Sequence, residues 1–196
     1  MKRPFIIGIG GTCSNVGKTM TAVLLLQHLS SGTEKWGAIK YTKTEFYTSL
    51  VDDKETLSRK DKDTGRFLEA GAGEVVWVKA PQRELADILP LALKRLSHND
   101  GIIAEGNSAI EFLKPDIVIF IFGNGKERWK PGIEILAGSS DIIICEDESE
   151  LPETAKTKRL FSGGRAGIKE VRVFLELISD LIYERKTERR NNEKGC

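Results

Sequence analysis

The residues best suited to chemistry lie in one run near the amino end, residues 10–19. The run reads Gly-Gly-Thr-Cys-Ser-Asn-Val-Gly-Lys-Thr. Small, turn-prone residues let backbone N–H groups converge on an anion, and the amino end of a following helix adds a positive dipole. Lys18 supplies a point charge for phosphates, and the hydroxyl of Thr19 is a ligand for Mg²⁺. We therefore predict a phosphate-binding loop (P-loop) for ATP or GTP with Mg²⁺.

The loop departs from the strict P-loop pattern, Gly-x-x-x-x-Gly-Lys-[Ser/Thr], at one position. The chain has Thr12 where the pattern has its first glycine, whereas Gly17, Lys18 and Thr19 match it. The assignment is kept because a P-loop requires a strand before it and a helix after it, and both are predicted here. The residues expected to bind the nucleotide are Gly11, Thr12, Cys13, Ser14, Asn15, Val16, Gly17, Lys18 and Thr19.

The elements around the loop follow from hydrophobic patterning. Residues 5–9 are apolar and bounded by Pro4 and glycines, which indicates a buried strand, and residues 18–29 lack Gly and Pro, which favours a helix. Further strands are predicted at 36–40, 75–78, 102–104, 117–122 and 142–145, and further helices at 64–70, 83–96 and 168–185. This alternation predicts an α/β fold with a doubly wound, mostly parallel sheet of the P-loop NTPase type.

Two segments show no clear periodicity. Residues 42–62 are polar and rich in charge, and we expect a mobile loop there with a short helix around 54–59. Residues 186–196 are polar, and we expect a disordered tail. With no internal repeat, the remaining residues, 1–185, are predicted to form a single nucleotide-binding domain.

Charged residues at strand ends are the next candidates, because ligands of such sheets bind at the carboxyl ends of the strands. Glu105 ends one apolar strand, and we expect it to hold Mg²⁺ together with Thr19. A solvent-facing glutamate is the alternative. Lys40 ends another strand and joins Lys18 as a candidate catalytic residue, which could reach the γ-phosphate or a second substrate. A solvated lysine is the alternative there.

Other charged residues have an open role. Asp63 and Arg66 are spaced to pair across one helical turn, or to contact a substrate. A basic loop follows the predicted strand at 117–122. It could hold an anionic second substrate or the nucleotide base, or only keep the loop soluble. Its polar members are Asn124, Lys126, Arg128 and Lys130.

Composition narrows the classes of function. The 196 residues include 30 Lys and Arg against 29 Asp and Glu, so a net charge of +1 gives no general attraction to nucleic acid or to acidic membranes. No apolar run reaches the roughly 18 residues of a membrane-spanning helix. Cys13, Cys145 and Cys196 form no C-x-x-C pair, so neither a zinc site nor a disulfide framework is indicated. We expect a cytoplasmic protein with reduced thiols.

The phosphate loop resembles that of dethiobiotin synthetase. The run Gly-Thr-Cys-Ser-Asn-Val-Gly-Lys-Thr at 11–19 is similar to that family's G-T-x-T-x-V-G-K-T. The wider class includes the cobyrinic acid amide synthases and the deviant-Walker ATPases. The signature lysine of the deviant-Walker ATPases would fall at Cys13, and its absence argues against a partition or metal-delivery ATPase. The resemblance also places a second metal-linked carboxylate near Asp52 and Asp53, although charged loops are usually only solvated.

The middle of the chain resembles molybdopterin-guanine dinucleotide biosynthesis protein B. Residues 37–40, Gly-Ala-Ile-Lys, are similar to an I-K-H-type strand end of that family, and 63–72 carry its D-[ST]-x-R-x-x-x-A-G-A motif. Residues 104–106, Ala-Glu-Gly, match its V-E-G. The resemblance covers roughly the first two-thirds of the chain. It departs at 41–45, where the family is rich in histidine and this chain has none, and Asn107 and Ser108 depart from the V-E-G-A-G-G of dethiobiotin synthetase.

The resemblance implies a GTP-binding accessory protein of molybdenum cofactor biosynthesis, which hydrolyses nucleotide slowly and acts with a partner enzyme. The alternative it implies is a ligase that uses ATP to activate a small carboxylate or carbamate, as dethiobiotin synthetase does. A third reading is a nucleotide-gated switch with negligible turnover. The sequence leaves open the choice between ATP and GTP, the second substrate or partner protein, and whether the chain is a monomer or a homodimer.

Overall fold

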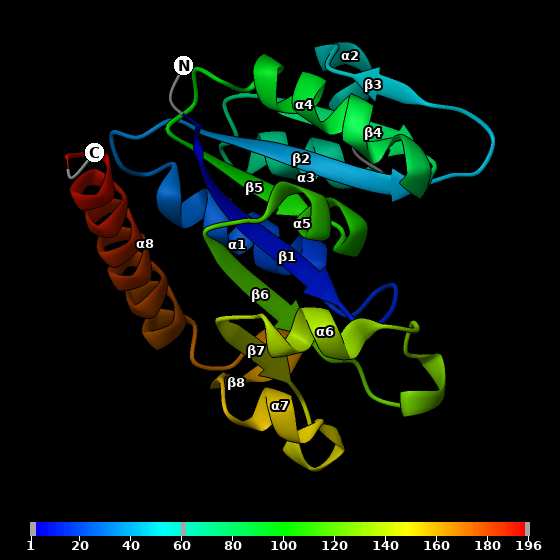
Figure 1. Cartoon of the computed structure of the whole chain (residues 1–196), viewed down its shortest axis with the longest axis vertical. Coiled ribbons are helices and arrows are strands. Elements are labelled where there is room, and N and C mark those ends of the chain that lie inside the picture. Colours follow the sequence, from blue (N-terminus) through cyan, green and yellow to red (C-terminus); the bar gives the residue numbers. More distant parts are fainter. Residues whose placement is uncertain (1–2, 60–61, 195–196) are drawn as a thin grey trace.

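The protein is built on one twisted sheet, as the computed structural model shows for residues 3–59 and 62–194 (Figure 1). The strand order is β3-β4-β2-β5-β1-β6-β7-β8-β9. The pairs from β4 to β8 are parallel, and the edge strands β3 and β9 are antiparallel to their neighbours. The strands are β1 (Phe5–Gly11), β2 (Trp36–Lys43), β3 (Ser49–Val51), β4 (Val75–Ala80), β5 (Gly101–Glu105), β6 (Ile117–Ile121), β7 (Ile142–Cys145), β8 (Arg159–Gly164) and β9 (Gly167–Ile168).

Helices cover both faces of the sheet. The helices are α1 (Lys18–Leu29), α2 (Lys54–Leu57), α3 (Asp63–Glu69), α4 (Leu85–Arg95), α5 (Asn107–Leu113), α6 (Ile133–Gly138), α7 (Glu153–Lys156) and α8 (Val171–Lys194). Side chains of α1, α3 and α8 share one buried cluster with β1. Side chains of α4 and α5 form a second cluster, and those of α6 and α7 belong to a third, on the opposite face. The predicted doubly wound α/β fold is confirmed.

The central strands show why the sequence folds this way. Every residue of β1, β5 and β6 is buried. Along β1 the side chains alternate, because Ile7 and Ile9 face the cluster with α1 whereas Ile6 faces the cluster with α4. A strand covered on both faces can be apolar at every position, as these are. The central strands therefore fix the position of the loop that follows β1.

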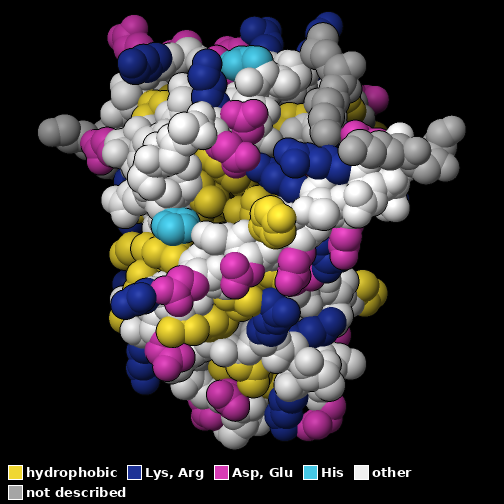
Figure 2. Space-filling view, turned by 90° about the vertical axis from the view of Figure 1, so that its left-hand side faces the viewer, with side chains coloured by type: hydrophobic (Ala, Val, Ile, Leu, Met, Phe, Trp, Pro, Cys, Tyr) yellow, Lys and Arg dark blue, Asp and Glu magenta, His cyan; other side chains and the backbone are white. Residues whose placement is uncertain are grey.

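At the carboxyl end of the chain, the structure differs from one prediction. Helix α8 continues to Lys194, so the expected disordered tail is wrong for residues 186–194, and residues 195 and 196 lie outside the described part. No Gly or Pro interrupts the helix. Three ion pairs tie its polar end to the rest of the molecule: Arg185 with Asp141, Lys186 with Glu34, and Arg189 with Asp116. Figure 2 looks onto the side where α8 lies and shows basic and acidic side chains interspersed there.

The charged stretch at 42–62 has more structure than predicted. Strand β2 runs on to Lys43, and β3 pairs antiparallel with the edge of β4. The short helix predicted around 54–59 is present as α2, over Lys54–Leu57. Its amino end is capped by Asp53, whose carboxylate accepts a hydrogen bond from the backbone N–H of Thr56 at 2.8 Å. Residues 60 and 61 lie outside the described part.

Candidate functional site

The predicted phosphate loop connects β1 to α1 at the carboxyl end of the sheet. Gly17, just before α1, has a φ of 109°, which strains any residue with a side chain. A Cβ on Gly17 would also collide with the backbone carbonyl of Gly164, at the end of β8. A Cβ on Gly11 would lie 2.6 Å from the side chain of Val16. Both glycines are therefore required by the path of the loop.

Lys18 lies across the mouth of this loop. Its Nζ donates a hydrogen bond to the backbone carbonyl of Cys13 at 2.7 Å. Burial lowers the pKa of Lys18, and the ammonium groups of Lys130 and Lys40 lower it further, while Glu105 acts in the opposite direction. The ammonium group thus lies near two other cations as well as the carboxylate of Glu105, and its hydrogen bond goes to a neutral carbonyl. An anion entering the loop would relieve that repulsion.

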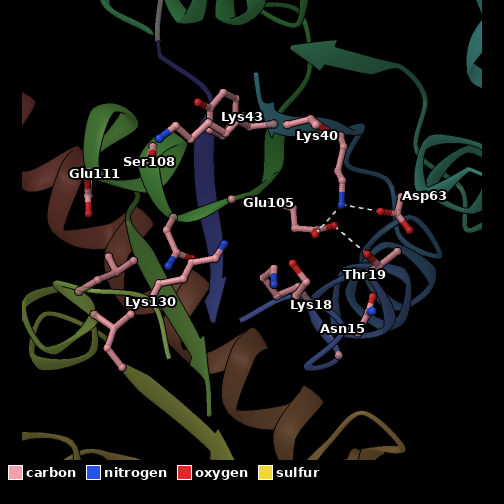
Figure 3. Close-up of a pocket in the computed structure, with 18 of the residues that line it drawn as sticks. Asn15, Lys18, Thr19, Lys40, Lys43, Asp63, Glu105, Ser108, Glu111 and Lys130 are labelled. Atoms are coloured by element: carbon pink, nitrogen blue, oxygen red, sulfur yellow. Dashed lines mark hydrogen bonds and ion pairs between the residues drawn. The ribbon is translucent and has the colours of Figure 1, made fainter. Parts of the chain in front are cut away.

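A buried carboxylate connects β5, β2 and α1 beside the loop. Glu105 ends β5, which lies between β1 and β2, and only 3% of its side chain is exposed. The hydroxyl of Thr19 donates to its Oε2 at 3.0 Å, and Lys40 Nζ lies 2.6 Å from its Oε1. Lys40 also pairs with Asp63 at the start of α3, with Nζ and Oδ2 2.5 Å apart. Figure 3 shows these contacts as dashed lines that join Thr19, Glu105, Lys40 and Asp63.

Lys40 is held in its charged form. Burial alone would lower its pKa, but the carboxylates of Glu105 and Asp63 outweigh burial, and the pKa of Lys40 is raised. Its two contacts place the charge between Glu105 and Asp63. The lysine therefore compensates a buried carboxylate, which would be costly without a partner.

Thr19 and Glu105 fit a magnesium ion shared with phosphates. Both offer hard oxygen donors, and their oxygen atoms lie 3.0 Å apart. Among the described residues, no group of three or more His, Cys, Asp or Glu side chains could hold a metal ion. Mg²⁺ is commonly held by one or two protein oxygens together with substrate phosphates, rather than by a protein cage. The donor set agrees with that kind of site.

Thr12, the departure from the strict pattern, has a structural role. Its side chain is fully buried, and its hydroxyl accepts a hydrogen bond from the backbone N–H of Gly123 at 2.9 Å. Its carbonyl accepts from the backbone N–H of Lys130, also at 2.9 Å. Positive φ values in the loop occur at Asn15 and Gly17 and not at Thr12, so a side chain is tolerated there. Thr12 thus joins the phosphate loop to the segment after β6.

A cavity of about 1060 Å³ opens over the loop. It is lined by residues of the phosphate loop, the ends of β2 and β5, the starts of α3 and α5, and the segment before α6. Of the residues singled out from the sequence, it brings together Ser14, Asn15, Gly17, Lys18, Thr19, Lys40, Asp63, Arg66, Glu105 and Lys130. The predicted site residues Gly11, Thr12, Cys13 and Val16 belong to the loop but do not line the cavity.

Several candidates lie away from this cavity. Asp52 pairs with Arg95 at 3.0 Å and lines a separate cavity. The side chain of Asp53 caps α2, as described above. The structure therefore gives both aspartates structural contacts in place of the metal-linked role that the resemblance suggested. In the basic loop, Arg128 donates to the carbonyl of Asn124 and does not line the cavity, so Lys130 is the one basic residue of that loop among its described lining.

The sequence reading missed other residues of the site. The side chain of Asn107 holds the phosphate loop, since its Oδ1 accepts from the N–H of Gly11 at 3.0 Å and its Nδ2 donates to the carbonyl of Gly11 at 3.1 Å. The feature of the sequence that could have identified Asn107 is its position shortly after Glu105, which ends a strand. Further polar lining residues are Tyr41, Thr42, Lys43, Gln82, Ser108, Glu111 and Arg165.

These features define a class of fold. A phosphate loop between β1 and α1, an acidic residue at the end of the adjacent β5 and helices on both faces of a mostly parallel sheet are the arrangement of a P-loop NTPase. No protein-family model matches the chain, and no curated protein sequence matches it. Several solved structures are similar to the chain.

One similar structure is HypB from Helicobacter pylori in complex with nickel, with a TM-score of 0.56 and 13% identity over 95% of this chain and 89% of that one. Another is LpxK from Aquifex aeolicus in complex with ATP, with a TM-score of 0.50 and 17% identity over 82% of this chain. The chain spans about half the length of that LpxK chain (54%) and of the signal recognition particle 54 kDa protein from Aeropyrum pernix (51%). At this identity the similarity shows the P-loop NTPase fold alone.

Within residues 3–59 and 62–194, none of the helices combines the length and the apolar character that crossing a membrane requires.

Proposed function

We propose that this chain binds a nucleoside triphosphate, ATP or GTP, together with Mg²⁺ in the cavity over the phosphate loop, and that it hydrolyses the nucleotide slowly. One observation carries the proposal. Lys18, Thr19 and Glu105 converge at the mouth of a loop that opens into a cavity, with Thr19 and Glu105 in direct contact. Binding of a triphosphate with magnesium needs an ammonium group for the phosphates, and a hydroxyl group and a carboxylate for the metal ion.

Each residue has a role in this proposal. Lys18 exchanges its contact with the Cys13 carbonyl for phosphate oxygens, and the loop N–H groups face the same phosphates. Thr19 and Glu105 hold Mg²⁺, which supplies neutralisation of the charge that develops on the phosphoryl oxygens. Lys40, fixed by Asp63, pairs with the Glu105 carboxylate and orients it.

Slow turnover is expected because the carboxylates beside the loop are already engaged. Glu105 accepts from Thr19 and Lys40, and Asp63 pairs with Lys40. A general base needs a carboxylate that can accept the proton of the attacking water. The isolated chain should therefore hydrolyse nucleotide slowly and respond to a partner that completes the site.

At a finer level, we propose an accessory role in molybdenum cofactor biosynthesis, of the molybdopterin-guanine dinucleotide biosynthesis protein B type. Support comes from the motif residues Lys40, Asp63 and Arg66, which line the same cavity as the phosphate loop. A second candidate is a ligase that activates a small carboxylate or carbamate with ATP. The observation that favours it is the extension of the cavity past the phosphate loop along Lys43, Ser108 and Glu111, which leaves room for an acceptor.

Ligand-dependent unfolding tests the nucleotide proposal. Thermal unfolding is measured with ATP, GTP, ADP and GDP, each with and without Mg²⁺. A ligand at 100 times its Kd stabilises a protein by about 2.7 kcal/mol, so a true ligand raises Tm by several degrees. The absence of a shift with every nucleotide would overturn the proposal.

Phosphate release separates the two finer roles. An accessory protein should release phosphate slowly alone and faster with a protein partner, whereas a ligase should respond to a small carboxylate or amine and release phosphate in proportion to a new product. The assay is run with the chain alone, with a pool of small metabolites, and with molybdopterin and cell extract. Rapid turnover triggered by a small molecule would favour the ligase.

A further inference from the structure

The segment after β6 is fastened to the phosphate loop. The Thr12 hydroxyl accepts from the N–H of Gly123, and the Thr12 carbonyl accepts from the N–H of Lys130. Between these contacts, the indole of Trp129 donates to the carbonyl of Gly123 at 2.9 Å and packs edge-on against Phe122, with ring centroids 5.1 Å apart. The backbone at position 130 is thus fixed relative to the loop, through the residue that departs from the strict pattern.

The side chain of Lys130 extends from this fixed backbone into the cavity (Figure 3). Its ammonium is close enough to Lys18 to lower the pKa of that residue. Among the described residues no carboxylate pairs with Lys130. Its basic neighbours are engaged elsewhere, since Lys126 lies over the Trp129 ring and Arg128 donates to the backbone of Asn124. Lys130 therefore contributes positive charge that no side chain in the described part of the chain neutralises.

We propose that Lys130 is a second phosphate-contacting cation of this site, and that Thr12 positions it through the hydrogen bonds to Gly123 and Lys130. Two ammonium groups that repel each other in one cavity favour a polyanion between them. Many P-loop NTPases receive a further cation from a partner or from another part of the chain. Here a lysine of the same chain, held against the loop backbone, fills that place.

This inference rests on the proposed function, and its first test compares two lysines of the same segment. Lys130→Ala should weaken binding of ATP or GTP about three- to tenfold, because it removes a charge-assisted contact whose strength is reduced by solvent exposure. Lys126→Ala, with the same charge change outside the cavity, should bind like the unmodified chain. Lys130→Arg should recover most of the affinity. Equal affinities for Lys130→Ala and Lys126→Ala would overturn the role of Lys130.

The second test addresses Thr12. Thr12→Val keeps the shape but removes the acceptor for the Gly123 N–H, and Thr12→Ser keeps the hydroxyl. We expect Thr12→Val to weaken triphosphate binding and Thr12→Ser to leave it close to normal. In the Lys130→Ala background, Thr12→Val should add little, because its effect passes through Lys130. An equal further loss in that background would show that Thr12 acts on the phosphate loop itself and would overturn the positioning role.

A measurement on the unmodified chain avoids any failure of these variants to fold. Acetic anhydride labels lysines at a rate that follows their accessibility, and peptide mass spectrometry reports each site. Saturating ATP or GTP should protect Lys130 and leave Lys126 unchanged. If nucleotide binds and protects Lys18 but not Lys130, this inference fails while the proposed function stands. If no nucleotide binds, the proposed function fails and this inference fails with it.

Discussion

The two sides of the cavity hold their lysines in opposite circumstances. On the β2 and β5 side, Lys40 is 15% exposed and lies between the carboxylates of Glu105 and Asp63. On the side of the segment after β6, Lys130 is exposed and extends into the cavity without a carboxylate partner in the part of the chain described. On the first side the charge of the lysine is paired without a ligand, whereas the second side carries a positive charge that a ligand would neutralise. Removing the lysine of the first side should therefore affect mainly stability, and removing the lysine of the second side should affect mainly nucleotide affinity.

Lys18 lies between these two sides and shares features of both. It is half-buried, as Lys40 is, but its hydrogen bond goes to the backbone carbonyl of Cys13 rather than to a carboxylate. Removing Lys18 leaves no buried charge behind, in contrast to removing Lys40. The two lysines thus offer a matched pair, in which one deletion should affect folding and the other should affect binding.

The largest effect expected is on stability, from Lys40→Met. This change leaves the Glu105 carboxylate, 3% exposed, without its cation, and breaking a buried pair costs about 3–5 kcal/mol. We expect about 3 kcal/mol, because Thr19 still donates to Glu105. Urea unfolding measures the change. Lys43→Met, an exposed lysine of the same strand, should change stability by less than about 0.5 kcal/mol. Equal stability for the two variants would remove the proposed contrast.

The next effect is on affinity, from Lys18→Ala. A hydrogen bond to a charged group contributes about 1.5–3 kcal/mol, so triphosphate affinity should fall tenfold or more. Titration calorimetry measures the affinity, and the free energy of unfolding without nucleotide should stay near that of the unmodified chain. An unchanged affinity in the folded variant would contradict the P-loop assignment.

A third variant separates the role of the metal ion from the binding of the nucleotide. Glu105→Gln removes the charge that Mg²⁺ needs but keeps a side chain of the same shape beside Thr19. Loss of such a ligand should reduce Mg²⁺-dependent hydrolysis about tenfold or more, while metal-free nucleotide binding changes little. The check is the hydrolysis rate at saturating Mg²⁺, together with calorimetry in EDTA. An unchanged rate would leave Glu105 as a purely structural partner of Lys40.

Local patterning predicts the centre of this fold and the centre of its site. Strands β1, β5 and β6 are apolar at nearly every position, so their burial on both faces can be read directly. Lys18 and Thr19 follow from the loop motif, and Glu105 from its place at a strand end. The structure brings these three residues to one cavity, as expected.

What could not be predicted depends on contacts between distant residues. The hydrogen bond between Thr12 and Gly123 joins positions 111 residues apart, and no local sequence pattern predicts it. The polar end of α8 gave a pattern typical of disorder, yet ion pairs such as Arg185 with Asp141 dock it. Strand β8 mixes exposed and buried residues and ends in two glycines, so neither periodicity nor propensity identifies it.

The smallest effect expected concerns two cysteines that report on access to the loop. Cys13 is half-buried beside Gly123, whereas Cys145 is buried, and burial with nearby Glu148 and Asp147 raises its pKa to about 11. At pH 8 about one Cys145 thiol in a thousand is ionised, and only the thiolate reacts.

In a Cys196→Ser chain, iodoacetamide should therefore modify Cys13 well before Cys145, and raising the pH to 9 should leave Cys145 mostly unmodified. Saturating nucleotide should slow the reaction at Cys13, because phosphates occupy the loop to which its backbone belongs. Peptide mass spectrometry follows both sites. Modification of Cys13 at the same rate with and without bound nucleotide would contradict the expectation that phosphates bound by the loop restrict access to this thiol, whose side chain does not itself line the cavity.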